Sequence, residues 1–315
     1  MKWRPLLFGL MLLAQSPPQR PSNPADGASA LRIDTTVVTL PVTVMDKQGR
    51  FVANLRRESF HLYEDGVEQQ IEFFQSIEAP VTIAILLDVS DSTESRFEEI
   101  KAAAIEFVNQ LRANDRVMLV TFDRNITVLS TPTDDLRRIQ DIIRFIRPGG
   151  GTRLYDTVEL VAREHLRPIR GRKGIVLFTD GVDTESKATW PMNARAVEES
   201  DAFVYPIQYT AVPKSPQMMN GIPVGAPRYR GNAASAGPYL NDLAEKSGGR
   251  FFMADTLESL RKSFATIAVE LRNQYSLGYY PSTEKRAGQR RKLKIQVDQP
   301  AVVIRARKSY IAGGK

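Results

Sequence analysis

Side chains that carry oxygen follow two apolar runs of the sequence and one stretch of glycines. Ile83–Leu87 leads directly into Asp88-Val89-Ser90-Asp91-Ser92, and Ile175–Phe178 leads into Thr179-Asp180-Gly181. Between these two segments, Gly149-Gly150-Gly151-Thr152 precedes a helical pattern. Because ligands of open α/β sheets bind beyond the carboxyl ends of the strands, the three segments can meet at one edge of a sheet.

The residue types in these segments suit a hard cation. Five residues offer only oxygen ligands: Asp88, Ser90, Ser92, Thr152 and Asp180. Mg²⁺ prefers about six oxygens in near-octahedral geometry, and Mn²⁺ or Ca²⁺ accept similar donors. Two carboxylates and three hydroxyls leave a position for water or for a partner's carboxylate. The sequence therefore predicts a Mg²⁺-type site.

Helix capping is the alternative explanation for these residues. Ser, Thr and Asp between a strand and a helix are favoured N-cap residues, and Ser92 or Thr152 fits that role. Capping explains any single residue of the set. It does not explain five oxygen-bearing residues in three separate segments, so we favour metal binding.

The elements that would position these residues lie between residues 79 and 274. Amphipathic helical patterns alternate there with strand candidates, and the strand runs are continuously apolar, which is typical of strands buried on both faces. The pattern predicts a doubly wound α/β domain with a mainly parallel sheet. The strand candidates are Thr82–Asp88, Arg116–Phe122, Gly174–Thr179, Ala202–Tyr209 and Arg250–Met253.

Strand patterns without helical periodicity flank this domain on both sides. Residues 31–78 contain β-branched runs and an Asp65-Gly66 hairpin turn, and residues 275–315 contain three further strand candidates. Neither flank offers enough strands for an independent core. We predict that the two flanks pair into one small β-sandwich, with residues 79–274 inserted between them.

The candidate metal residues also carry a family resemblance. Asp88-Val89-Ser90-Asp91-Ser92, Thr152 and Asp180 resemble the metal-ion-dependent adhesion site of von Willebrand factor type A domains. The resemblance covers about residues 79–274 and implies a six-stranded sheet wrapped by helices. It also implies that the hydroxyls of Ser90, Ser92 and Thr152 bind the ion and that a partner's Glu or Asp completes the shell. Asp91 departs from the pattern, since relatives often have glycine there.

The two flanks extend the resemblance to a bacterial exported subgroup of these domains. The similar segments are Val42–Asp46, Phe60–Gly66 and Gln274–Pro281. This subgroup supplies an architecture but little information on function.

The N-terminus predicts export. Lys2 and Arg4 precede the apolar stretch Leu6–Leu13, as in a signal peptide, so we assign residues 1–16 to a signal and residues 17–30 to a Pro-rich linker. We expect a secreted or periplasmic protein with no membrane span. The chain has no cysteine, which excludes disulfides, zinc–thiolate sites and thiol catalysis.

Catalysis is disfavoured by the histidines. The chain has two, His61 in the first β flank and His165 in a helical pattern, and neither is near a nucleophile motif. The glycine stretch lacks the lysine of a phosphate-binding P-loop. We therefore expect a protein that is not an enzyme.

Basic residues are concentrated at the C-terminal end. Residues 284–315 hold ten Lys or Arg and two Asp or Glu, a balance of +8 within a chain of net charge +7. Solvated strand faces account for such charges, and nucleic acid is not expected because no binding motif is present. The alternative function is an envelope-associated structural module that binds anionic surfaces.

Three local features complete the sequence prediction. After Tyr209, residues 210–238 read as a long loop with basic, Met and Tyr residues beside the metal edge. Asp156 is expected to order the metal loop, whereas Asp183 reads as a surface residue. Asp255 and Glu258 are spaced to cap the last helix.

Together these features predict a metal-ion-dependent, adhesion-type protein-binding module of an exported protein. The expected cofactor is Mg²⁺, with Mn²⁺ or Ca²⁺ as alternatives. The expected partner is a protein that presents an acidic residue.

Overall fold

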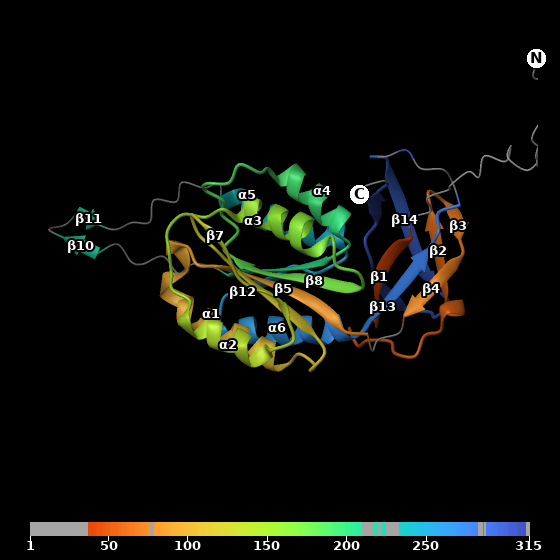
Figure 1. The fold of residues 1–315 in the computed structure, drawn as a ribbon, viewed down its shortest axis with the longest axis horizontal. Coiled ribbons are helices and arrows are strands. Elements are labelled where there is room, and N and C mark those ends of the chain that lie inside the picture. Colours follow the sequence, from red (N-terminus) through yellow and green to blue (C-terminus); the bar gives the residue numbers. More distant parts are fainter. Residues whose placement is uncertain are drawn as a thin grey trace, which may run out of the picture. The chain divides into compact units, whose positions relative to one another are not determined.

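A computed structural model describes residues 37–75, 79–209, 217–219, 222–224, 233–282, 286 and 288–312. Its central part is a six-stranded sheet with the strand order β12-β9-β8-β5-β6-β7 (Figure 1). Five of these strands run parallel, and β7 is antiparallel at one edge. The strands are β5 (Val81–Asp88), β6 (Arg116–Phe122), β7 (Ile126–Thr133), β8 (Arg172–Thr179), β9 (Phe203–Tyr209) and β12 (Phe252–Ala254).

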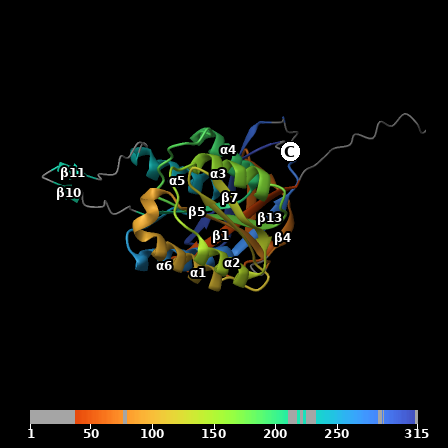
Figure 2. The same ribbon diagram turned by 60° about the vertical axis from the view of Figure 1, so that its left-hand side comes forward.

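Helices cover both faces of this sheet, as Figures 1 and 2 show. Alternate residues of β5 enter two separate cores, with Ile83 and Ile85 on one face and Ala84 and Leu86 on the other. The first face is covered by α1 (Phe97–Asn109), α2 (Leu136–Phe145) and α6 (Leu257–Arg272). The second is covered by α3 (Leu154–Leu160) with the π-helical turn η3 (Val161–Leu166), α4 (Trp190–Ser200) and α5 (Ala233–Ser247). This is the doubly wound arrangement that the continuous apolar runs predict.

The flanking segments form two four-stranded antiparallel sheets, with strand orders β15-β1-β13-β4 and β16-β14-β2-β3. Their buried side chains form one core, in which Leu40 and Leu62 contact Tyr275 and Leu277 as members of a single cluster. The predicted β-sandwich is therefore confirmed. Its strands are β1 (Val38–Asp46), β2 (Phe60–Glu64), β3 (Val67–Gln69), β4 (Ile71–Gln75), β13 (Gln274–Tyr279), β14 (Arg290–Val297), β15 (Val302–Arg305) and β16 (Ser309–Ile311).

A buried charge cluster holds the two flanks of the sandwich together. Glu64 on β2 accepts a hydrogen bond from Arg291 Nε at 2.8 Å and one from the Tyr310 hydroxyl at 3.0 Å. The Tyr279 hydroxyl donates to the same carboxylate. Glu64 and Arg291 are both buried. A buried carboxylate without partners is costly. The N-terminal flank therefore needs these C-terminal residues to bury Glu64 in the folded sandwich.

The structure differs from the sequence prediction in several places, and one of them is the additional strand β16. The sixth strand, β7, is not among the strand candidates, because its alternating, half-exposed residues end in Pro132 and Thr133. Residues 233–238 belong to helix α5 and not to a loop; Pro238 lies inside this helix. The last helix is capped by Thr256 and Ser259, which exchange side-chain and backbone hydrogen bonds, and not by Asp255 and Glu258.

Some sequence predictions lie outside the described residues. These include the signal and linker, residues 1–30, and most of residues 210–232, of which only the hairpin β10 (Gln217–Met219) and β11 (Ile222–Val224) is described. Within the described part of the chain, no helix is long and apolar enough to cross a membrane.

The strand pairing predicts how fragments of the chain should fold. Among the described strands of residues 31–78, only β2 and β3 pair with each other, since β1 and β4 both pair with β13. An isolated two-stranded hairpin is marginally stable. We therefore expect residues 79–274 alone to unfold in one cooperative urea transition and residues 31–78 alone to give an unfolded circular dichroism spectrum. Ordered structure in residues 31–78, or none in residues 79–274, would contradict the proposed domain boundaries.

Candidate metal centre

The predicted metal residues lie at the carboxyl ends of two neighbouring central strands. Asp88 is the last residue of β5, and Asp180 follows directly after β8. These strands are paired in parallel, with Leu87 opposite Phe178. Ser90 directly precedes a 3₁₀ helix, η2 (Asp91–Arg96), and Ser92 lies in its first turn. The parallel pairing therefore brings both aspartates to the same edge of the sheet.

Hydrogen bonds fix the carboxylate of Asp88 among hydroxyl groups. Its Oδ1 accepts from Ser90 Oγ at 2.5 Å and from Ser90 N at 3.0 Å, and its Oδ2 accepts from Thr179 Oγ1 at 2.7 Å. The hydroxyls of Ser90 and Ser92 lie 3.0 Å apart. Asp88 is completely buried, and Asp180 is only 8% exposed. The turn thus presents two hydroxyls beside two buried carboxylates.

The two aspartates destabilise each other's charge. Burial raises the pKa of Asp88, and the charge of Asp180 raises it further. Burial also raises the pKa of Asp180, although a hydrogen bond from Val182 N and one from Ser92 lower it. Within the described residues, neither carboxylate forms an ion pair with Lys or Arg. Two buried carboxylates without a basic partner fit a bound cation, which would supply the missing positive charge.

The glycine loop brings the third segment to this turn. Gly149 N donates to Val89 O at 2.6 Å, so the loop lies against the residue between Asp88 and Ser90. A side chain at position 149 would meet Asp123, since a Cβ there would lie 1.8 Å from its Oδ2. Gly151 has a φ of +75°, which favours glycine. The loop can therefore approach only because these positions lack side chains.

Thr152, at the end of the glycine loop, is 5% exposed. Its backbone is fixed by Thr184, whose hydroxyl accepts from Thr152 N at 2.9 Å and whose N donates to Thr152 O at 3.0 Å. Thr184 lies in the loop that follows Asp180, so β8 positions both residues. No hydrogen bond joins the Thr152 side chain to the other four candidates among the described residues.

Helix capping does not account for the site. The N-cap of η2 is Ser90, whose side chain makes no capping hydrogen bond, and the N-cap of α3 is Arg153, not Thr152. Ser92 lies inside η2. Helix capping therefore explains neither Ser92 nor Thr152, the two residues that fit this role in the sequence.

Asp91, which stands where relatives often have glycine, is exposed and faces the glycine loop. A Cβ at Gly150 would lie 3.4 Å from Asp91 Oδ2. The Asp91 carboxylate therefore lies beside the glycine loop as well as in contact with solvent.

The donor set excludes a site built from several acidic or imidazole ligands. No group of three or more His, Cys, Asp or Glu side chains is gathered for a metal ion in the part of the chain that the structure describes. A metal at Asp88 and Asp180 would depend on hydroxyls and water for the rest of its shell. This composition suits Mg²⁺-type ions better than zinc, which favours nitrogen and sulfur ligands.

Sequence reasoning missed two residues of this region. Thr179 bonds both Asp88 Oδ2 and Gly181 N, and it is completely buried. Asp183 is more than a surface residue, since its carboxylate accepts from Tyr155 N at 3.0 Å and from Ser186 N at 3.1 Å. The signal for Thr179 was its position as a polar residue at the end of an apolar strand.

Residues 83–182 match the family model of the von Willebrand factor type A domain. The matched range contains all five candidate metal residues. This part of the chain is similar to the von Willebrand factor type A domain. A search of curated protein sequences found no match.

Several solved structures resemble this domain. BatB from Bacteroides thetaiotaomicron is 19% identical, with 62% of this chain and 100% of that chain covered and a TM-score of 0.47. The vWF domain of the type V pili tip protein Mfa5 from Porphyromonas gingivalis is 16% identical, with 61% and 95% covered and a TM-score of 0.48. Proximal thread matrix protein 1 from the mussel byssus, with a zinc-occupied MIDAS motif, is 14% identical, with 68% and 50% covered and a TM-score of 0.49.

Asp156 orders the loop that holds Thr152 in this type A domain. Its Oδ1 accepts from Lys187 N at 3.0 Å and from Ala188 N at 2.7 Å, and its Oδ2 accepts from Arg153 Nε at 2.9 Å. Partial burial would raise the pKa of Asp156, but these hydrogen bonds outweigh it and hold the pKa below its ordinary value. The carboxylate therefore contributes stability above the unfolded pKa of about 3.9 and loses it as the pH falls through the lower folded value.

We expect Asp156→Ala to lower the free energy of unfolding by about 1–3 kcal/mol at pH 7, because the backbone N–H groups of Lys187 and Ala188 lose their acceptor. The difference from the parent should shrink below about pH 4, where the parent carboxylate becomes protonated. Urea unfolding at several pH values measures both effects, with Asp134→Ala as a matched exposed control. An unchanged difference between pH 7 and pH 3 would contradict this role.

Proposed function

We propose that this chain is a metal-ion-dependent protein-binding module in which Asp88, Ser90, Ser92, Thr152 and Asp180 hold a Mg²⁺-type ion. The observation that carries the proposal is the pair of buried carboxylates, Asp88 and Asp180, set beside two hydroxyls without a basic partner. When bound, the ion would supply a positive, oxygen-seeking position for a carboxylate of the partner protein.

The chain's own residues prepare this position. Thr179 and Ser90 hold the Asp88 carboxylate from both oxygens, which fixes its orientation. Burial of Asp88 limits competition from water, and the backbone bonds of Thr152 keep the glycine loop closed against the turn. Because these contacts exist within the protein itself, the site is preorganised for a partner.

We infer binding and not catalysis, because neither histidine of the chain lies at the site. His61 lies on β2 of the sandwich, where its ring nitrogens contact Glu68 and Asp298 at 3.0 Å each. His165 lies in η3 at the side of the domain. Catalysis by metal-activated water would need a base within hydrogen-bond reach of the reacting proton.

We further propose that the protein acts outside the cytoplasm. Lys2, Arg4 and the apolar stretch Leu6–Leu13 support export. An exported, metal-dependent binding domain fits an adhesion-type role, in which the acidic group of the partner is captured on a surface of this protein.

Titration calorimetry of the full chain with Mg²⁺, Mn²⁺ and Ca²⁺ tests the metal centre. We expect saturable Mg²⁺ binding by the parent, no detectable binding by Asp88→Ala, and at least about tenfold weaker binding by Ser90→Ala, because each change removes an oxygen donor. Asp134→Ala is the control and should bind like the parent. Circular dichroism checks that each variant is folded. A folded parent that binds none of the three ions would overturn the proposal.

A second candidate function is favoured by a basic groove on the sandwich. The groove has a volume of about 780 Å³, and no acidic residue lines it. Lys292 and Lys294 on β14 and Lys308 before β16 form no ion pair with a carboxylate of the described residues. Residues two apart on a strand point to the same side, so β14 presents a row of positive charge. Such a row can hold the protein on an anionic surface.

Flotation with phosphatidylglycerol and phosphatidylcholine vesicles tests this second function. If it holds, the parent should bind only the anionic vesicles, in the presence of EDTA, and lose binding as salt is raised. The double variant Lys292→Glu/Lys294→Glu should bind at least about tenfold more weakly, whereas Lys262→Glu on α6 should not. Equal binding of the double variant would contradict a role for the groove.

A further inference from the structure

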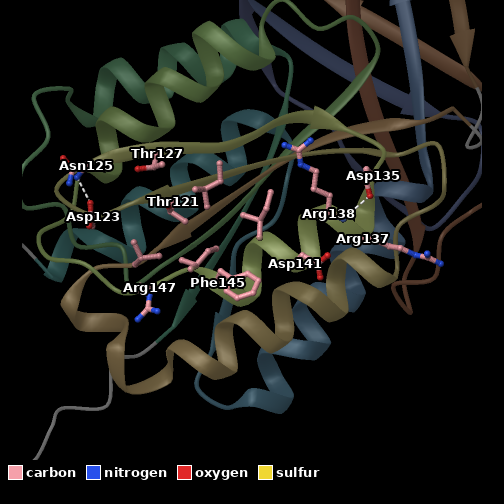
Figure 3. Close-up of a pocket in the computed structure, with 14 residues that line it drawn as sticks. Thr121, Asp123, Asn125, Thr127, Asp135, Arg137, Arg138, Asp141, Phe145 and Arg147 are labelled. Carbon is pink, nitrogen blue, oxygen red and sulfur yellow. Dashed lines mark hydrogen bonds between the residues drawn. The ribbon is translucent and has the colours of Figure 1, made fainter.

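A groove of about 920 Å³ lies between the edge strand β7 and helix α2 (Figure 3). Thr127 and Leu129 line it from alternate positions of β7. Arg138, Ile142 and Phe145 line it from α2, at spacings of three and four that place them on one helical face. The groove is therefore a built feature of two packed elements.

The inner surface of the groove is apolar. Leu129, Ile142 and Ile146 are partly buried and pack against the core beneath the first sheet face. Phe145 is 82% exposed, the largest exposed fraction of any large apolar residue that the structure describes. An aromatic ring left in water beside half-buried aliphatic side chains can bury much more area when a partner covers it.

The lining of the groove holds three aspartates and three arginines, which differ in whether they have partners within the protein. Three carboxylates in the lining are engaged locally: Asp123 accepts from Asn125 N, Asp135 caps α2 through Arg138 N, and Asp141 pairs with Arg144. In contrast, the guanidinium groups of three lining arginines form no ion pair with any carboxylate of the described residues. These residues are Arg137, Arg138 and Arg147, all exposed. The positive charge of the groove is thus available to a ligand.

The groove is continuous with the candidate metal centre. Val89, which lines it, lies between Asp88 and Ser90 in the sequence. Asp123, which also lines it, lies against Gly149 of the glycine loop. A ligand chain that leaves the metal edge beside Val89 therefore enters the groove directly.

We infer that the groove binds the segment of the partner protein next to its metal-binding carboxylate, and that this segment carries a large apolar side chain followed or preceded by a second acidic residue. The apolar side chain packs on Phe145 and Ile142, and the second carboxylate pairs with Arg138 or Arg147. This inference rests on the proposed function and assigns the partner's chemistry. Because the apolar surface is recessed between a strand and a helix, it fits an inserted side chain and not a flat lipid surface.

Peptide selection on the immobilised full chain tests the inference. The probe is a library of random phage-displayed peptides of about twelve residues, which reach roughly 40 Å when extended. The library is bound in Mg²⁺ and eluted with EDTA. We expect the eluted peptides to share an acidic residue, a large apolar residue a few positions away and a second acidic residue. A peptide with this pattern should bind Phe145→Ser at least about tenfold more weakly than the parent.

Further variants test the arginines of the groove, and control variants test whether surface changes elsewhere affect binding. Arg138→Glu/Arg147→Glu should weaken the same peptide at least about tenfold and reduce the salt dependence of binding. Phe73→Ser and Arg170→Glu, at exposed positions elsewhere, are the controls and should bind like the parent. All five altered residues are exposed, so we expect the buried cores to stay intact, and thermal unfolding checks this.

Two outcomes distinguish failure of the groove from failure of the metal site. EDTA-eluted peptides that share only an acidic residue, or that bind Phe145→Ser and Arg138→Glu/Arg147→Glu like the parent, would overturn the groove and leave the metal site standing. No EDTA-eluted peptide, together with no calorimetric binding of Mg²⁺ to the parent, would overturn both.

Discussion

The constraint on which the rest of the structure depends is the burial of two like charges at the ends of neighbouring strands. Asp88 and Asp180 follow continuous apolar runs, and the same runs place them out of water. Burial and mutual repulsion raise the pKa of Asp88. The surrounding hydroxyls of Ser90, Ser92 and Thr179 lessen this cost but add no positive charge. An arrangement that is unfavourable for the protein alone would become favourable with the proposed cation.

The β-sandwich leaves that edge free because it is attached at the opposite one. The chain enters β5 at Val81 directly from the sandwich and returns to it at Gln274 after α6. Arg305 on β15 pairs with Glu270 near the end of α6 at 3.0 Å. Arg307 donates to the carbonyl oxygens of Glu198 at 3.1 Å and Thr39 at 2.8 Å. These contacts gather where α4 and α6 end and where β9 begins. The candidate metal residues, at the carboxyl ends of the strands, therefore lie away from these contacts.

The fold could be predicted wherever burial determines the residue pattern. The apolar strands β5 and β8 are buried on both faces, and their runs mark them almost to the residue. The edge strand β7 is exposed on much of its surface, so its mixed sequence carried no such signal. The cap of α6 shows a second limit. Asp255 and Thr256 are both good N-cap residues, and only the backbone decides that Thr256, with extended angles, is the cap.

The candidate site was predictable to the extent that its residues follow strands in the sequence. Asp88 and Asp180 were assigned from their positions alone, but the groove beside them combines residues from β7, α2 and Val89, which no sequence window contains together. Arg138 and Arg147 read as ordinary surface charges until the local partners of Asp123, Asp135 and Asp141 are known. The groove, which only the structure reveals, is thus the feature that we propose to determine which partner is bound. The proposed metal centre would accept any carboxylate, whereas an apolar groove with unpaired arginines beside it would reject most of the proteins that carry one.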